Sequence, residues 1–370
     1  MLPATARDHS YRTTRRPRPV ALLLPGQGAQ HPGMAAGLYR HDPEFTAAVD
    51  EVLEHFGAEG ARIRADWTGE GPPSVPLDDV RRAQPLLFAV DYGLARMVLG
   101  WGVRPTALLG HSAGELVAAA LAGVVPLPEA VAMVRERVRA AVRIPAGGML
   151  AVGLAADRLA PYVTDDVAVA AVNANQQTML AGSKAPLAAV LERLRHDGHA
   201  VMVVPATSPF HSPAMEPAAK EVEAAYRSMA FRPPDLALYS GYTGSLMTPE
   251  EACSPRFWAR QITDTVHFAD ALESLLAVED MLLLEAGPRQ TLTAFARRHR
   301  AVRHGASIAV PLLPARPGAP DRDRAAVRAA ADALAEEGHE LAWAAVGTRA
   351  VPSPVADRGR GVGHTPRGSS

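Results

Sequence analysis

The chain has very little cysteine and lysine, and each shortage narrows what the protein can be. Cys253 is the single cysteine among 370 residues, so neither an internal disulfide nor a cysteine metal cluster can form. Lysine occurs only at Lys184 and Lys220, and arginine supplies the remaining basic side chains. The 38 basic and 39 acidic residues leave a formal net charge of −1. This balance gives no overall attraction to nucleic acid or to an anionic membrane.

Long apolar runs are also missing. No segment reaches the roughly 20 apolar residues that a membrane span requires. The first 19 residues are rich in arginine but lack the apolar core and cleavage site of a secretory signal. We therefore expect a cytoplasmic protein with a disordered leader at 1–19 and no membrane or nucleic-acid partner. A disordered tail is expected at 347–370, where Gly, Pro, Arg and Ser predominate.

The rest of the chain alternates short apolar runs with amphipathic segments, which is typical of an α/β protein. Three runs read as buried parallel strands: 20–24, 106–109 and 281–285. Helical spacing of apolar residues or helix-forming composition predicts helices at 84–99, 115–122, 127–143, 291–298 and 321–337. We expect an α/β-hydrolase-like main domain with a parallel sheet, formed by residues 20–145 and 208–346.

The pattern changes between these two segments. Strands are predicted at 149–154, 167–172, 178–181 and 200–204, with a helix at 186–197 and a helical or turn segment around Pro161. The order β, α, β, β, α, β is that of a ferredoxin-like unit. Residues 146–207 are therefore expected to form an inserted ferredoxin-like subdomain.

A G-x-S-x-G sequence, Gly110 to Gly114, lies between an apolar run and a helix-forming run. This is the setting of a nucleophile elbow, in which the serine sits on a sharp strand-to-helix turn with its hydroxyl exposed. Ser112 is then the expected nucleophile. The amide of Ala113 would face the oxygen on which negative charge develops.

A serine nucleophile needs a base and a second oxyanion donor. Gly26-Gln27-Gly28 follows the first strand, and the first βα loop of an α/β sheet can supply that second amide. His211 follows a constrained loop at the return from the insertion, and it is the best candidate base. His111 is the rival, but a neighbour of the nucleophile in an elbow points away from its hydroxyl. His111 is expected to pack or to form a structural hydrogen bond.

These motifs resemble, in order and spacing, those of the malonyl-CoA:acyl carrier protein transacylases and of polyketide synthase acyltransferase domains. The resemblance rests on Gly26-Gln27-Gly28, on Gly110 to Glu115, on Phe210-His211-Ser212 and on Glu285 to Pro288. It extends over about 20–346. The ending Gly338 to Trp343 is more similar to the polyketide synthase domains.

The resemblance implies a role for several residues. Ser112 matches the acylated nucleophile, and His211 matches its base in a dyad without an acidic third member. Gln27 and Ala113 match the oxyanion amides. A backbone carbonyl holds the second ring nitrogen of the base in this family, and the matching position is about His267. The residues matching the lining of the substrate site are Gln84, His111, Asn173 and Asn175.

The resemblance also bears on the acyl group. Arg137 matches the arginine that binds the free carboxylate of malonyl or methylmalonyl groups, a task that suits a planar guanidinium. Phe210, directly before the base, goes with malonyl in this family, because a bulky ring narrows the space beside the α-carbon. Such a pocket gives only a preference, since one methylene changes binding by about 1–3 kcal/mol.

The expected reaction is transfer of malonyl from coenzyme A, through an acyl-serine, to the phosphopantetheine thiol of an acyl carrier protein. The coenzyme A thioester is a substrate, and no permanently bound cofactor or metal is expected. The absence of ketosynthase and carrier motifs predicts a free-standing monomer that acts in trans. Docking of the carrier is expected on a local basic patch, for which the candidates are Arg139, Arg143, Arg193 and Arg195.

Three alternatives remain open from the sequence. A discrete acyltransferase could move an aminoacyl or other group between carriers and would not need Arg137. An acyl hydrolase could use the same dyad with water as acceptor. A scaffold protein with an inactive site is disfavoured by the presence of both Ser112 and His211.

Overall fold

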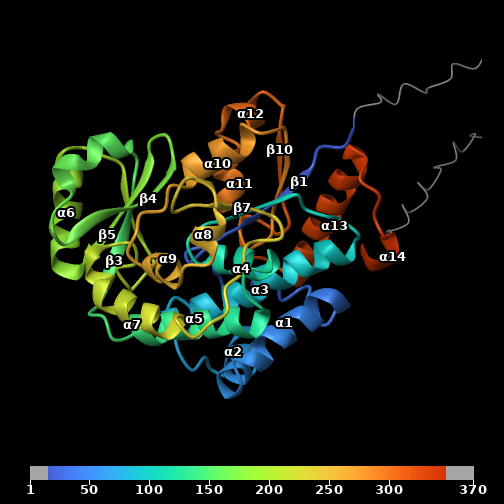
Figure 1. The fold of residues 1–370 in the computed structure, drawn as a ribbon, viewed down its shortest axis with the longest axis horizontal. Coiled ribbons are helices and arrows are strands. Elements are labelled where there is room, and N and C mark those ends of the chain that lie inside the picture. The colour runs from blue at the N-terminus through green and yellow to red at the C-terminus, as the bar shows by residue number, and fades with distance from the viewer. Residues whose placement is uncertain (1–15, 347–370) are drawn as a thin grey trace, which may run out of the picture.

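The computed structural model describes residues 16–346. The expected tail at 347–370 and most of the expected leader, residues 1–15, lie outside the described residues. Two sheets organise the described chain, one of six strands and one of four. In Figure 1 the smaller sheet and its helix form the green lobe at one side, beside the larger helix-flanked sheet. No helix in this range combines the length and apolarity needed to cross a membrane.

The larger sheet has the strand order β10-β9-β1-β2-β7-β8, in which only β8 is antiparallel to its neighbour. Leu24 at the end of β1 pairs with Gly110 at the end of β2, so the loops that follow the two strands emerge side by side. This places Gln27 and Ser112 at one edge of the sheet. The strands are β1 (Val20–Leu24), β2 (Ala107–Gly110), β7 (Ala237–Ser240), β8 (Ser245–Leu246), β9 (Leu282–Glu285) and β10 (Ile308–Pro311).

Helices cover both faces of this sheet, as expected for a parallel sheet whose strands are apolar throughout. Leu22 and Leu24 face a core built mainly with α3, α4 and α5, whereas Ala21 and Leu23 face α10 and α11. Five helices that precede the insertion contribute to the first core: α1 (Pro43–His55), α2 (Ala58–Thr68), α3 (Val80–Gly100), α4 (Gly114–Leu121) and α5 (Leu127–Ala141).

Further helices follow the insertion, and the sequence patterns had indicated only α11 and α13 among them. Helices α8, α9, α12 and α14 are too short for a periodicity argument, whereas α7 and α10 do have helical spacing of apolar residues and were overlooked. They are α7 (Glu216–Tyr226), α8 (Pro249–Ala252), α9 (Pro255–Arg260), α10 (Phe268–Leu276), α11 (Thr291–Ala296), α12 (Arg300–Arg303), α13 (Pro320–Glu337) and α14 (Trp343–Val346), with a 3₁₀ turn η2 (Pro213–Met215).

The smaller sheet is antiparallel with strand order β4-β5-β3-β6, so the first and third strands of the unit lie at its centre. This is the ferredoxin-like topology, and it confirms the expected inserted fold. The segment around Pro161 is a 3₁₀ helix. The elements are β3 (Gly147–Val152), η1 (Ala156–Tyr162), β4 (Val167–Ala174), β5 (Gln177–Ser183), α6 (Lys184–His196) and β6 (Val201–Val204).

The two ends of the insertion meet beside the loop that carries His211. The amide of Gly147, where the insertion begins, donates to the carbonyl of Thr207, where it returns, at 3.0 Å. The insertion also joins the main domain along β4. Val172 donates to the carbonyl of Val266 at 2.8 Å, and Val266 donates to that of Ala170 at 3.0 Å. These bonds fix the subdomain against the edge of the main sheet where β2 ends.

Candidate active site

The turn between β2 and α4 has the geometry of a nucleophile elbow. Ser112 has a φ of +52°, a left-handed conformation that a serine adopts only when its surroundings impose it. The flanking glycines permit the sharp turn. A Cβ on Gly110 would lie 2.3 Å from Cα of Glu115, and one on Gly114 would lie 2.1 Å from the carbonyl oxygen of Leu24. The sequence expectation for this turn is therefore matched in detail.

The structure brings Ser112 and His211 together. The serine Oγ lies 2.7 Å from Nε2 of the histidine, and both side chains are buried. His211 also has a positive φ, +63°, and its amide donates to the carbonyl of Ile262 at 2.8 Å. The histidine ring is therefore aimed at the nucleophile by a backbone that is fixed at the junction of the two domains.

The second ring nitrogen of His211 is held by Asp264, which corrects the expectation for His267. Nδ1 lies 2.9 Å from the carbonyl oxygen of Asp264. A carbonyl only accepts, so Nδ1 carries the proton and Nε2 has the free lone pair. His267 lies three residues further on, where its half-exposed ring is 3.6 Å from a carboxylate oxygen of Asp270. Spacing in the sequence cannot tell which carbonyl, that of Asp264 or that of His267, faces the ring of His211. The segment 263–267 is irregular and gives no periodic signal.

Burial, and then the positive charge of Arg137, lower the pKa of His211 to about 3. The imidazole is therefore neutral at physiological pH. A neutral Nε2 at hydrogen-bond distance can take the serine proton, which is what general-base activation of a hydroxyl requires.

Arg137 lies on the buried face of α5 and points toward the dyad. Its Nη2 is 3.5 Å from Oγ of Ser112, and its guanidinium carbon lies 5.2 Å from the centre of the Phe210 ring. The side chain is 1% exposed, whereas its neighbours Arg135 and Arg139 are more than half exposed. Helix register alone separates the three arginines, since residue 137 shares a face with Met133 and Ala141.

Two glutamines converge on the elbow from the other side. Nε2 of Gln84, on α3, donates to Oε1 of Gln27 at 3.1 Å. The loop that carries Gln27 packs directly on the elbow, because a Cβ on Gly26 would lie 3.2 Å from Cβ of Ser112 and 3.3 Å from the amide nitrogen of Ala113. Since α4 begins one residue after Ala113, this amide lies at the positive end of a helix.

Of the two candidate asparagines, Asn173 is hydrogen-bonded to the elbow. Its Oδ1 is 2.7 Å from Nε2 of His111, whose ring packs on Phe268 with centroids 5.5 Å apart. His111 thus has the structural hydrogen bond expected of it. Asn175 lies exposed in the turn between β4 and β5, and its place in the site stays a prediction. Asn173 lies within β4, whereas Asn175 lies just beyond the end of that strand, in the turn that leads into β5.

The four arginines considered for carrier docking are all engaged within the protein. Three of them pair with glutamates: Arg139 with Glu136, Arg143 with Glu221, and Arg195 with Glu192. Arg193 donates to the carbonyl of Pro161 and stacks over the ring of Tyr162. These contacts reduce the free positive charge of the expected patch.

Comparison with known protein families identifies the family of this chain. Residues 22–330 match the model of the acyl transferase domain family. The chain belongs to this family. No group of three or more His, Cys, Asp or Glu side chains within 16–346 is arranged to hold a metal ion.

Several relatives of this acyltransferase belong to polyketide synthases. It is 39% identical over 281 residues to one of the phenolphthiocerol/phthiocerol polyketide synthase subunits of Mycobacterium tuberculosis, a match that covers 76% of this chain and 19% of that protein. The chain thus spans about a fifth of this relative's length.

Solved acyltransferase domains have the same fold. The domain from the second module of the salinomycin polyketide synthase is 31% identical, with a TM-score of 0.80 over 90% of this chain and 76% of that one. The acyltransferase domain of SpnD, solved as a complex with 2-(pent-4-yn-1-yl)malonyl, is 30% identical, with a TM-score of 0.80 over 87% and 77% of the two chains.

Sequence reasoning missed two residues of the acyltransferase site. Glu115, directly after the elbow, is fully buried and accepts hydrogen bonds from Ser240 Oγ at 2.8 Å, the Gly241 amide at 2.9 Å and Gln261 Nε2 at 2.9 Å. Burial raises its pKa to about 8, against the opposite effect of these bonds. Tyr242, beside them, packs its ring 6.1 Å from that of His211. The chain around Ser240 to Tyr242 shows no helix or strand periodicity, so the sequence gave no signal for the contacts of Glu115 or of Tyr242.

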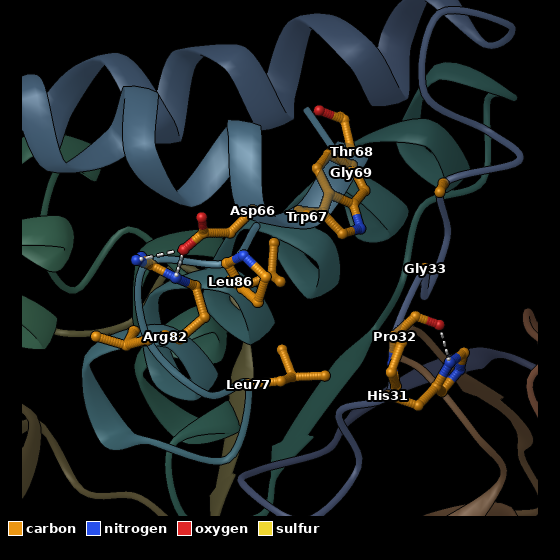
Figure 2. Close-up of a pocket in the computed structure, with 13 residues that line it drawn as sticks. His31, Pro32, Gly33, Asp66, Trp67, Thr68, Gly69, Leu77, Arg82 and Leu86 are labelled. Atoms are coloured by element: carbon orange, nitrogen blue, oxygen red, sulfur yellow. Dashed lines mark hydrogen bonds and ion pairs between the residues drawn. The ribbon is translucent and has the colours of Figure 1, made fainter. Parts of the chain in front are cut away.

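A separate cavity of about 390 Å³ lies on the other side of the Gln27 loop, between that loop, α2 and α3. Figure 2 shows Arg82 and Asp66 paired at one end of it, and His31 at the other with its ring turned to the carbonyl of Pro32. Apolar side chains, among them Trp67 and Leu86, lie between the two ends. Arg82 donates to Asp66 and to Ser74, and these bonds hold the 66–82 segment in place.

Proposed function

We propose that this acyltransferase moves a malonyl group from coenzyme A, through an ester of Ser112, to the phosphopantetheine thiol of an acyl carrier protein in polyketide or fatty acid biosynthesis. One observation carries the choice of acyl group. The guanidinium of Arg137 is buried next to the nucleophile, and its Nε and Nη1 have no hydrogen-bond partner within the described residues. A buried, unpaired cation is costly, and a carboxylate on the acyl group would provide the missing partner.

The first half-reaction begins at the dyad. Nε2 of His211 takes the proton of Ser112 while Oγ attacks the thioester carbonyl carbon. The amides of Gln27 and Ala113 hold the oxyanion of the tetrahedral intermediate. Collapse of this intermediate breaks the C–S bond. The proton on His211 goes to the departing thiolate of coenzyme A, and the acyl group remains on the serine.

The second half-reaction reverses these steps with a different thiol. The carrier's pantetheine thiol gives its proton to His211, and its sulfur attacks the ester carbonyl. Ser112 then leaves and regains its proton. Because thioester is exchanged for thioester, the two halves are nearly balanced in free energy and can share one site.

One further point supports an unbranched acyl group, and a second supports a carboxylated one. The Phe210 ring lies against both Arg137 and His211, with a centroid distance of 6.4 Å to the latter, and it narrows the space beside the acyl α-carbon. The related SpnD domain is described in complex with a substituted malonyl group, which is a carboxylated acyl unit.

The test is the intact mass of the protein after separate incubation with malonyl-, methylmalonyl- and acetyl-CoA. We expect a malonyl adduct that forms fastest and is absent from Ser112→Ala. Addition of a phosphopantetheinylated carrier should then move the adduct to the carrier. Preferential labelling by acetyl-CoA would contradict the proposed acyl group. Loss of the adduct to water at the same rate with and without carrier would indicate a hydrolase instead.

A further inference from the structure

The loop between β7 and β8 brings a tyrosine to the nucleophile. Tyr242 follows β7, the strand that neighbours the elbow strand β2 in the sheet. Its ring packs against His211 at an interplanar angle of 39°. Its hydroxyl lies near both the Ser112 hydroxyl and the Arg137 guanidinium. Tyr242 thus lines the same small space as the dyad and the unpaired arginine.

The Tyr242 hydroxyl is buried and has no hydrogen-bond partner of normal geometry within the described residues. Burial raises the pKa of this phenol, while Arg137 acts in the opposite direction, so the phenol keeps its proton and can donate it in a hydrogen bond. An unpaired buried donor costs free energy in the same way as the free N–H groups of Arg137. The Tyr242 hydroxyl and two N–H groups of Arg137 thus lack a hydrogen-bond partner of normal geometry within the described residues, although the Ser112 hydroxyl lies near both side chains.

The backbone holds this tyrosine in place. The Tyr242 amide donates to Oγ of Ser240 at 3.0 Å, and the Ser240 hydroxyl donates in turn to Glu115. Glu115 also receives the amide of Gly241 and lies in the first turn of the helix that follows the elbow. The nucleophile and the tyrosine are therefore tied to one buried carboxyl group, which fixes the distance between them.

We propose that Tyr242 is a specificity residue whose hydroxyl donates a hydrogen bond to the free carboxylate of the acyl group, beside the charge pair that Arg137 makes with it. This inference rests on the proposed function and adds a residue to it. A carboxylate has two oxygens and about four acceptor positions, so it can satisfy the guanidinium and the phenol together. A monocarboxylic acyl group such as acetyl would leave both donors unpaired, and it would be disfavoured on that account.

The test compares Tyr242→Phe with Tyr239→Phe, which removes a hydroxyl from β7 itself on the side packed against α10. The rate of Ser112 acylation is followed by intact mass with malonyl-CoA and with acetyl-CoA. We expect Tyr242→Phe to lower kcat/KM for malonyl-CoA about 10- to 100-fold, the usual range for a hydrogen bond to a charged group. Acetylation should change less than about twofold, and Tyr239→Phe should resemble the wild type with both substrates.

Two further measurements separate binding from structure. Because the hydroxyl is unpaired, Tyr242→Phe should leave the midpoint of thermal unfolding unchanged or raise it. In an Arg137→Ala background the same change should cost malonylation much less than in the wild type, since residues that share one ligand are coupled.

Equal losses of acylation rate with malonyl- and acetyl-CoA would overturn the proposal. They would indicate that the Tyr242 hydroxyl acts on Ser112 and not on the acyl carboxylate. An unchanged malonylation rate would overturn it as well. Failure of the wild type itself to accept malonyl would instead overturn the proposed function, so the two outcomes are distinguishable.

Discussion

Oγ of Ser112 lies 2.7 Å from Nε2 of His211, although the two residues are 99 positions apart in the chain. The first stands on the elbow of the main sheet, and the second stands where the inserted subdomain returns. The ferredoxin-like unit folds between them, and its two ends meet beside the histidine. The insertion therefore leaves the dyad intact while adding Asn173 to the site.

Replacing the nucleophile should abolish the acyl adduct and leave the fold unchanged. Ser112→Ala removes Oγ but keeps a Cβ, so the elbow can retain its conformation. Mass spectrometry should show no adduct with malonyl-CoA, and circular dichroism should match the wild type. An adduct of undiminished yield on the variant would show that another side chain is acylated.

Loss of the base should slow acylation at least about 100-fold, the usual contribution of general-base catalysis. His211→Ala removes the group that takes the serine proton. His111→Ala is the matched control, because it removes a neighbouring imidazole that bonds to Asn173 and not to Ser112. Single-turnover acylation rates decide the point. A larger effect at His111 than at His211 would reverse the assignment.

Arg137→Ala should weaken the use of malonyl-CoA by a factor of about 10 to 1000, since a charge-assisted pair in a buried pocket is lost. Acetyl-CoA has no carboxylate, so its use should hold or rise. Arg135→Ala, two positions away on the exposed face of α5, is the matched control and should have no effect on either substrate. Equal losses with malonyl and acetyl groups would mean that Arg137 acts only on the fold.

Acylation should persist in mild acid. Burial and Arg137 lower the pKa of His211 to about 3, so the base is still neutral at pH 5. A histidine with the ordinary pKa of about 6.5 would be mostly protonated there, and the rate would fall about 30-fold from its plateau. We expect a fall of less than about threefold in the single-turnover rate between pH 7.5 and 5. An inflection near pH 6.5 would contradict this.

The lowered pKa of His211 also affects the free energy of unfolding. Because the pKa of folded His211 lies below its unfolded value, this residue makes the folded state less stable as the pH falls below about 6.5. The acid limit of the rate measurements should therefore be checked by circular dichroism, which separates unfolding from protonation of the base.

Glu115 should act on stability in the opposite direction. Burial raises its pKa from 4.5 to about 8, so its contribution to stability is full below pH 4.5 and is lost as the pH rises through 8. Glu115→Gln cannot ionise. The free energy of unfolding of the wild type, relative to this variant, should fall by on the order of a few kcal/mol between pH 5 and 8.

Urea denaturation at pH 5, 6.5 and 8 measures this difference. Glu192→Gln, at an exposed position on α6, is the control and should track the wild type at every pH. A difference between the wild type and Glu115→Gln that does not change with pH would contradict the raised pKa.

Much of the architecture could be predicted because its signals are local. The strand at 20–24 was expected with the bounds it has, since an all-apolar run ended by Pro25-Gly26 indicates a buried parallel strand. The topology of the insertion followed from the order of its elements. By contrast β7, which carries Tyr242 to the site, has the mixed sequence Ala-Leu-Tyr-Ser instead of an all-apolar run, and its type is settled by pairing with β2.

Some residues of the candidate site could be predicted from the sequence, and others could not. The elbow motif and the loop position of His211 indicated the dyad, and the resemblance to a known family pointed to Arg137 among several arginines of α5. The resemblance did not separate Asn173 from Asn175, and it placed the carbonyl that holds the base at His267 instead of Asp264. Asn173 lies within β4 while Asn175 lies beyond its end in an exposed turn, and Asp264 replaces His267 because an irregular segment presents a different carbonyl.

The sequence by itself determined the elbow. The sharp turn depends on residues that are adjacent in the chain, Gly110-His111-Ser112-Ala113-Gly114, together with the apolar strand before them and the helix after them. It also determined the alternation of strands and helices, since a repeating apolar pattern suits only one kind of element. Tertiary structure alone decided which partners the buried polar side chains have. Arg137 lacks a partner, Glu115 receives three donors and Tyr242 faces the nucleophile because segments more than 100 residues apart pack together. Burial depends on what covers a side chain, and the covering residues here come from distant parts of the chain.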